Sequence, residues 1–184
     1  SVLYNYDTTR KVTLENMIEH SKSVRIGVKK SLMVVDMPYR TYQNKRQALT
    51  NARKILKETK CEAVKLEGGF KIKSIVEYLI NNKIPVMGHL GLLPQSIKGK
   101  FKSKGKTERE KNKLISESKL LESLGVFAIV LECIRGKTAD LITKSISIPT
   151  IGIGSSAYCD GQVLVTDDLV GLNSTSIKLS LIHI

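Results

Sequence analysis

Apolar residues along this chain alternate between two spacings, one typical of helices and one typical of buried strands. Helical spacing occurs in five segments, at 14–24, 48–56, 72–80, 107–124 and 137–144. Short, nearly continuous apolar runs lie between and after them, at 32–35, 63–66, 84–87, 126–131, 150–153 and 162–165. Strands that alternate with helices predict a parallel sheet, because parallel neighbours need a crossover connection.

The apolar runs predict strands that are covered on both faces. A (β/α)₈ barrel and a doubly wound sheet both satisfy this pattern, and spacing alone does not separate them. Residues 151–154 read Ile-Gly-Ile-Gly and lack the third glycine of a dinucleotide-binding loop. Thr107 and Glu110 have the spacing of a capping box at the start of a helix, and Gly125 is placed to end that helix.

Composition predicts one soluble domain in a reducing compartment. The chain has 184 residues, and its three cysteines are far apart. No apolar run approaches the roughly 20 residues of a membrane span, so we expect a cytoplasmic protein. The formal charge of +13 raises the possibility of a nucleic-acid-binding module, which stays open as an alternative. Lysines spread over every helix and an aromatic content of 5% favour solvated helix surfaces instead.

Ionisable residues stand where several strands end. Asp36, Glu67 and Glu132 each close an apolar run, and Lys65 lies two positions before Glu67 on the same strand face. Strand ends of a parallel barrel form its active-site mouth. Three carboxylates at one mouth need protonation or a cation, and oxygen ligands suit Mg²⁺. A structural cluster of ion pairs is the alternative.

Two further features lie near these strand ends. His89, between Gly88 and Gly91, is expected at a strand end, where it either contacts a ligand or serves the scaffold through hydrogen bonds. The lysine-rich segment 97–106 follows, and it is either a mobile lid that attracts an anionic cofactor or a solvated loop.

Six motifs in order make the chain resemble the ketopantoate hydroxymethyltransferase family over about residues 1–171. They are Asp36-Met37-Pro38, Lys65-Leu66-Glu67-Gly68-Gly69, residues 85–91 with Pro94-Gln95-Ser96, Val130-Leu131-Glu132, residues 148–154, and residues 160–165. The resemblance implies a (β/α)₈ TIM barrel of the phosphoenolpyruvate/pyruvate-like superfamily. It also implies transfer of a hydroxymethyl group from 5,10-methylenetetrahydrofolate to 2-oxoisovalerate, in pantothenate and coenzyme A synthesis, by a homo-oligomer (a decamer in the family).

The resemblance also implies roles for the residues at the strand ends. Asp36 and Glu67 would belong to a Mg²⁺ site that stabilises an enolate of the substrate, with Asp36 also contacting the substrate. Lys65 and His89 would bind the substrate, and Glu132 would be the general base that removes the C3 proton.

The sequence departs from the family pattern in several places. We expect a piece of the barrel without its first two strands and without an upstream Asp-Ser pair. We also expect a catalytic domain over 1–171, a non-native tail over 172–184, and no activity from the chain alone. Tyr39, Ser155-Ser156 and Arg135 replace residues that are usual in the family. A related metal–enolate lyase barrel and an inactive remnant of the barrel are the remaining alternatives.

Overall fold

The computed structural model describes residues 6, 8–96 and 103–170. They form one parallel sheet in which each strand pairs with the next along the chain, in the order β1-β2-β3-β4-β5-β6. The strands are β1 Val34–Asp36, β2 Ala63–Glu67, β3 Val86–Gly91, β4 Ala128–Glu132, β5 Thr150–Ile153 and β6 Gly161–Gln162. The α-helices are α1 Leu14–Gly27, α2 Lys45–Thr59, α3 Lys73–Asn81, α4 Glu108–Ser123, α5 Gly136–Ser145 and α6 Thr166–Leu169. Two 3₁₀ turns, η2 Thr9–Lys11 and η3 Phe70–Ile72, complete the elements.

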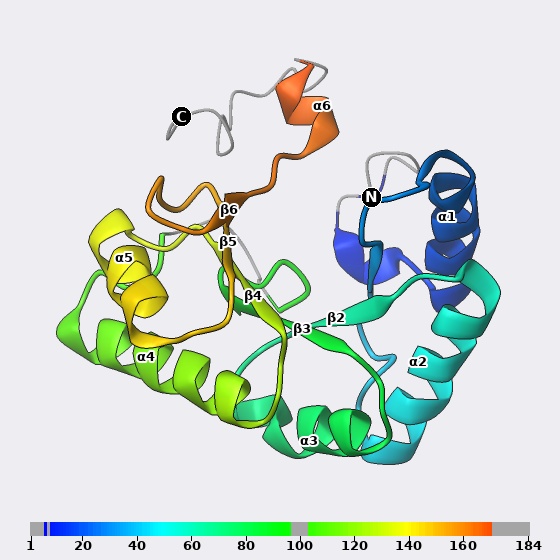
Figure 1. Cartoon of the computed structure of the whole chain (residues 1–184), viewed down its shortest axis with the longest axis horizontal. Helices are drawn as coiled ribbons and strands as arrows, with labels where there is room; N and C mark the ends of the chain where they lie inside the picture. The colour runs from blue at the N-terminus through cyan, green and yellow to red at the C-terminus, as the bar shows by residue number, and fades with distance from the viewer. Residues whose placement is uncertain (1–5, 7, 97–102, 171–184) are drawn as a thin grey trace.

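The sequential strand order excludes a doubly wound sheet, in which the strand order reverses at a switch point. Helices α1 to α5 instead lie in an arc outside the curved sheet, and among the described residues none of these five helices lies on its inner side (Figure 1). This arrangement is a partial (β/α) barrel, because a closed barrel of this type has eight strands. The predicted fold class is therefore confirmed, and the alternative of a doubly wound sheet is removed.

The two sheet faces have separate apolar cores. The outer core joins strand residues such as Val64, Leu66 and Ile129 to the apolar sides of the helices. A smaller inner cluster contains Met87, Ala128 and Val130. Since side chains alternate between faces along a strand, residues in register with this inner cluster also point inward.

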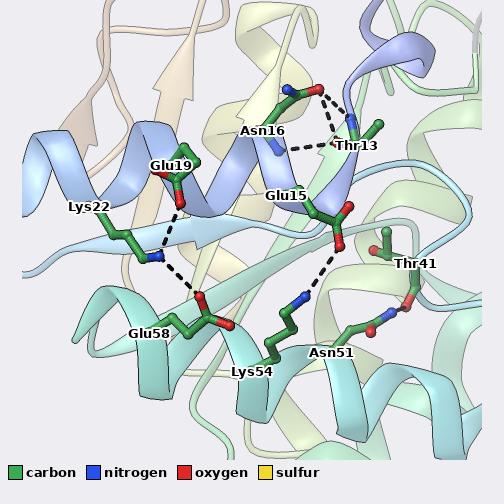
Figure 2. Close-up of polar contacts among 9 residues, drawn as sticks. All are labelled: Thr13, Glu15, Asn16, Glu19, Lys22, Thr41, Asn51, Lys54 and Glu58. Carbon is green, nitrogen blue, oxygen red and sulfur yellow. Dashed lines mark hydrogen bonds and ion pairs between the residues drawn. The ribbon is translucent and has the colours of Figure 1, made fainter.

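The first two helices lie side by side, and charged residues bridge their exposed surfaces (Figure 2). Lys22 Nζ lies 3.1 Å from a Glu58 oxygen, and Lys54 Nζ lies 3.2 Å from one of Glu15. Exposed pairs of this kind contribute about 0–1 kcal/mol each, so the buried apolar residues hold the helices in place. Thr13 caps the start of α1 by accepting a hydrogen bond from the Asn16 backbone N–H at 3.1 Å.

Several predicted elements differ in detail from those observed. The strand predicted at 84–87 continues to Gly91, so His89 lies inside a strand instead of at its end. The strand predicted at 162–165 has only two residues, Gly161–Gln162. The strand predicted at 32–35 is Val34–Asp36, because Leu32 is exposed before the sheet begins.

Two predictions about helices were also wrong in part. Val24, expected on the apolar side of the first helix, is exposed. Thr107 does accept from the Glu110 N–H at 3.2 Å, but the Glu110 carboxylate accepts from the Lys106 N–H instead of closing the box with Thr107. Residues 97–102 of the lysine-rich segment, and the tail predicted at 172–184, lie outside the described residues.

Candidate active site at the carboxyl ends of the strands

The sheet brings the predicted site residues to one face and one end. Asp36 is in register with Lys65, and Glu67 is in register with His89. Glu132, the last residue of β4, is in register with Gly91 at the end of β3. All of these positions share the inner face, because each pair points to the same side of the sheet and His89 is itself paired with inward-facing Val130. The predicted convergence of strand ends is therefore present.

Lys65 and Asp36 form the first contact within this group. Lys65 Nζ lies 2.9 Å from Asp36 Oδ2, with the lysine largely buried and the aspartate more exposed. The ammonium group thus neutralises one carboxylate of the cluster. The contact engages Asp36 Oδ2, and Asp36 is the more exposed partner of the pair.

Glu67 lies in a less favourable environment for a charge. The pKa of Glu67 is raised to about 7, mainly by burial and to a smaller extent by the nearby carboxylates of Asp36 and Glu132. A hydrogen bond from the Gln95 backbone N–H, 3.1 Å from Glu67 Oε2, acts in the opposite direction, as does the charge of Lys65. A carboxylate with this pKa gains from a cation placed beside it.

His89 and Glu132 form a second buried pair. His89 Nε2 lies 3.1 Å from Glu132 Oε2, and the histidine side chain is 2% exposed. The two groups are close but not aligned as a hydrogen bond, and neither ring nitrogen has a hydrogen-bond partner among the described residues. Buried polar atoms usually have such partners, so the two ring nitrogens are exceptions within this structure.

The backbone around Glu132 is tightly constrained. The Glu132 carbonyl accepts from the Leu92 N–H at 2.8 Å, which joins the ends of β3 and β4. A Cβ on Gly91 would lie 2.2 Å from that same carbonyl oxygen, and Gly91 has φ +98°. Only glycine fits this close approach of two backbones. Cys133 follows with φ 51°, an uncommon conformation for a residue other than glycine.

Cys133 is a cysteine at the mouth that the sequence analysis did not place there. Its thiol is buried, and burial together with the Glu132 charge raises its pKa to about 11. Because the thiolate is the reactive form, this thiol is protonated near neutral pH. The site therefore offers carboxylate, imidazole and ammonium chemistry, with no activated thiol at this position.

A cavity of about 530 Å³ opens beside Glu67. Its wall includes Tyr39 and Tyr42 from the segment after β1 and the apolar residues Leu90 and Leu114. Cationic side chains also line it, namely Arg40, Lys71, Lys104 and Lys113. Glu67, Glu110 and Glu117 line it as well, so the cavity combines aromatic, apolar, basic and acidic groups.

The carboxylates of this site determine whether a metal ion fits there. No group of three or more His, Cys, Asp or Glu side chains in the described part of the chain is arranged to hold a metal. The expectation that three carboxylates share one cation is therefore not met. Mg²⁺ is usually bound through one or two carboxylates, with water and substrate completing its shell. Asp36 and Glu67, with the raised pKa of Glu67, fit that smaller requirement.

Sequence reasoning missed the residues that support this site. Gln95, Tyr42 and Cys133 contact or adjoin the site residues, but none was assigned a role. Pro94 before Gln95 was a turn signal, although nothing in the spacing showed that this turn folds back onto Glu67.

A singly wound parallel sheet with ionisable residues at its strand ends defines a (β/α)-barrel enzyme. Residues 1–180 match the family described as ketopantoate hydroxymethyltransferase, and the chain belongs to that family. It is similar to 3-methyl-2-oxobutanoate hydroxymethyltransferase of Pelagibacter ubique, with 64% identity over 94% of this chain and 67% of the relative. The Clostridium novyi protein of the same name is 49% identical, over 94% of this chain and 64% of that relative. The chain thus spans about two thirds of these relatives, and the division predicted at residue 171 stays a prediction.

Solved structures confirm the fold. The chain is similar to oxaloacetate acetylhydrolase, with a TM-score of 0.57 and 12% identity over 90% of this chain and 59% of that one. It is also similar to 2,3-dimethylmalate lyase of the PEP mutase/isocitrate lyase superfamily, with a TM-score of 0.55 and 11% identity. That match covers 82% of this chain and 54% of the lyase chain. In the part of the chain that the structure describes, no helix has the length and apolar character to cross a membrane.

Proposed function

We propose that the protein transfers a hydroxymethyl group from 5,10-methylenetetrahydrofolate to 2-oxoisovalerate, giving ketopantoate. The observation that carries this proposal is the placement of Asp36, Lys65, Glu67, His89 and Glu132 on one sheet face at the strand ends, in a chain of this family. The reaction is a carbon–carbon bond formation. The C3–H bond of the oxoacid breaks, and the C3 carbanion forms a new C–C bond to the one-carbon unit. Both C–N bonds that tie this unit to the folate break, and water supplies the hydroxyl group. The C3 proton and the remaining water proton go to the two folate nitrogens, so tetrahydrofolate leaves.

Glu132 is the proposed base for C3. Its carboxylate is largely buried and lies beside the His89 imidazole, in a position to accept a proton from substrate on the inner face. His89 would contact the same substrate, since its ring nitrogens lack hydrogen bonds. Lys65 would place its ammonium group near the negative charge that develops when the proton leaves.

Asp36 and Glu67 are the proposed holders of a Mg²⁺ ion. Bound there, the ion would polarise the keto group of the oxoacid as a Lewis acid. The Glu67 carboxyl, with its pKa near 7, would lose its proton when the cation binds, so cation binding is expected to release protons at neutral pH. Asp36 would keep its contact with Lys65 through one oxygen.

The cavity beside Glu67 is the proposed site of the folate co-substrate. Its aromatic and apolar wall would accept the ring system, and its cationic side chains would face the glutamate carboxylates. Further proposals, drawn from the family resemblance, are that the protein is cytoplasmic and forms a homo-oligomer. Its cysteines, all three buried and free, are compatible with a reducing compartment.

Deuterium exchange at C3 of 2-oxoisovalerate, followed by NMR with Mg²⁺ and without folate, tests the base directly. We expect exchange by the protein as its gene encodes it, and a loss of about 10²- to 10⁴-fold in the Glu132→Gln variant. The matched control is Glu122→Gln, which changes a partly exposed helix glutamate that accepts from the Ser147 N–H. No exchange by the unaltered protein, or full exchange by Glu132→Gln, would overturn the proposed mechanism.

A further inference from the structure

Gln95 is buried in the turn after β3, and its backbone N–H, backbone carbonyl, side-chain Nε2 and side-chain Oε1 all have partners. Its backbone N–H donates to Glu67 Oε2 at 3.1 Å, and its backbone carbonyl accepts from Arg10 Nε at 2.8 Å. Its side-chain Nε2 donates to the Met37 carbonyl at 3.0 Å, and Oε1 accepts from the Tyr42 hydroxyl at 3.1 Å. One residue therefore joins η2, the segment after β1, the end of β2 and the segment after β3.

The turn itself is well defined. The Ser96 N–H donates to the Leu93 carbonyl at 2.8 Å, which closes a four-residue turn with Pro94 second and Gln95 third. Proline in the second position fixes φ for that turn. The Gln95 N–H is thus presented to Glu67 by a rigid backbone, while the side chain extends toward the segment after β1.

The bond from the Gln95 side chain reaches the residue that follows Asp36. The Met37 N–H donates to the Lys65 carbonyl at 3.0 Å, and the Met37 carbonyl accepts from Gln95. Met37 is fully buried, so water cannot replace Gln95 as the hydrogen-bond donor to the Met37 carbonyl. The backbone just after Asp36 is therefore held from two sides, by β2 and by Gln95.

Resting on the proposed function, we propose that Gln95 is a positioning residue that holds the Asp36 and Glu67 carboxylates together for a divalent cation. It contacts Glu67 directly and reaches Asp36 through Met37. Groups that orient metal ligands typically change metal affinity by about 10- to 100-fold when they are removed. A purely structural hydrogen bond would change the stability of the fold and leave cation affinity unaltered.

The test is the affinity for Mn²⁺ without substrate, measured as free Mn²⁺ by electron paramagnetic resonance in the Gln95→Met variant. Methionine has a similar length but neither donates nor accepts as the amide does, so the bonds to Met37 and Tyr42 are lost. We expect an affinity about tenfold or more weaker than that of the unaltered protein. Tyr42→Phe removes only the hydroxyl that donates to Gln95, so a smaller loss is expected. This second variant keeps the test valid should Gln95→Met fail to fold.

Asn51→Leu is the matched control. Asn51 Nδ2 donates to the Thr41 carbonyl at 2.7 Å, so it also secures the segment after β1 through a side-chain amide (Figure 2). This hydrogen bond involves neither Asp36 nor Glu67. We expect it to lower the free energy of unfolding while leaving Mn²⁺ affinity unchanged.

The outcomes separate the two proposals. Equal Mn²⁺ affinity in Gln95→Met, Tyr42→Phe and the unaltered protein would overturn the role of Gln95 and leave the proposed function standing. If Asn51→Leu weakened Mn²⁺ affinity as much as Gln95→Met, the role of Gln95 would also be overturned. The lost affinity would then come from a less stable segment after β1. No Mn²⁺ binding by the unaltered protein would remove the cation from the proposed function, and the role of Gln95 would fail with it.

Discussion

His89 Nε2 lies 3.1 Å from Glu132 Oε2, yet the two groups are not aligned as a hydrogen bond. Both side chains are on the inner face of the sheet, one strand apart, and both are largely shielded from water. A protein optimised only for stability would align such a pair, because an unsatisfied buried polar group costs about 1–3 kcal/mol. We expect that a bound substrate completes the pair.

The first prediction concerns His89→Leu. Leucine is similar in size and needs no hydrogen bond, so we expect the free energy of unfolding to be unchanged or about 1 kcal/mol higher. C3 exchange should fall about 10- to 100-fold, because the imidazole no longer contacts substrate beside Glu132. Urea unfolding and NMR exchange on the same sample measure both quantities. A large loss of stability with normal exchange would show that His89 serves only the scaffold.

The sequence predicted the inner-face residues correctly because strand periodicity and parallel pairing determine where they point. Lys65 and Glu67 are two positions apart on one strand, and parallel order brings Asp36 and Glu132 to the same end. The family motifs assigned the roles. The ends of short strands were less predictable: His89 lies inside β3 because its strand continues through two glycines.

Long-range contacts explain what the sequence did not predict. Gln95 reaches Met37 and Tyr42, which are 58 and 53 residues away along the chain. No local pattern encodes a partner at that separation. Cys133 likewise has φ 51°, and its N–H donates to the Ile153 carbonyl on β5. A cysteine is not a residue from which a left-handed conformation would be expected.

The second prediction is a pH dependence of stability that originates at Glu67. Its pKa is raised from 4.5 to about 7 in the folded chain, so between these pH values the folded state holds a proton that the unfolded state has released. Stability should therefore fall as pH rises through that window. At about 1.4 kcal/mol per pH unit, the difference between 4.5 and about 7 sets an upper limit of about 3 kcal/mol.

Glu67→Gln should remove that dependence. Glutamine stays neutral and its amide oxygen can still accept from the Gln95 N–H. Without divalent cations, we expect the variant to match the unaltered protein near pH 4.5 and to be more stable at pH 8, by up to about 3 kcal/mol. Urea unfolding at several pH values measures the difference. If the free energy of unfolding changed with pH in the same way for the two proteins, Glu67 would have an ordinary pKa.

The third prediction concerns Lys65→Met, which removes the ammonium group 2.9 Å from Asp36 Oδ2. Loss of a positive charge beside two carboxylates should strengthen Mn²⁺ binding by about 3- to 10-fold, since about 1 kcal/mol of repulsion is relieved. The same change should slow C3 exchange, because a positive charge near the developing negative charge is lost. Mn²⁺ titration and NMR exchange test the two effects separately. Weaker cation binding would mean that Lys65 organises the carboxylates instead of competing with the ion.

The last prediction tests the backbone that carries Glu132. In Gly91→Ala, the new Cβ would lie 2.2 Å from the Glu132 carbonyl oxygen at a residue whose φ is +98°. Contact with a backbone atom cannot be relieved by a rotamer change, so we expect a loss of about 3 kcal/mol or more in the free energy of unfolding. Gly27→Ala is the control, because a Cβ there has nothing within 4 Å, and it should be neutral or stabilise α1 by up to about 1 kcal/mol. The two variants add the same methyl group, so urea unfolding compares position alone. Equal stability of the two would mean that the ends of β3 and β4 can separate without cost, and Glu132 would then lack the fixed backbone that a positioned base requires.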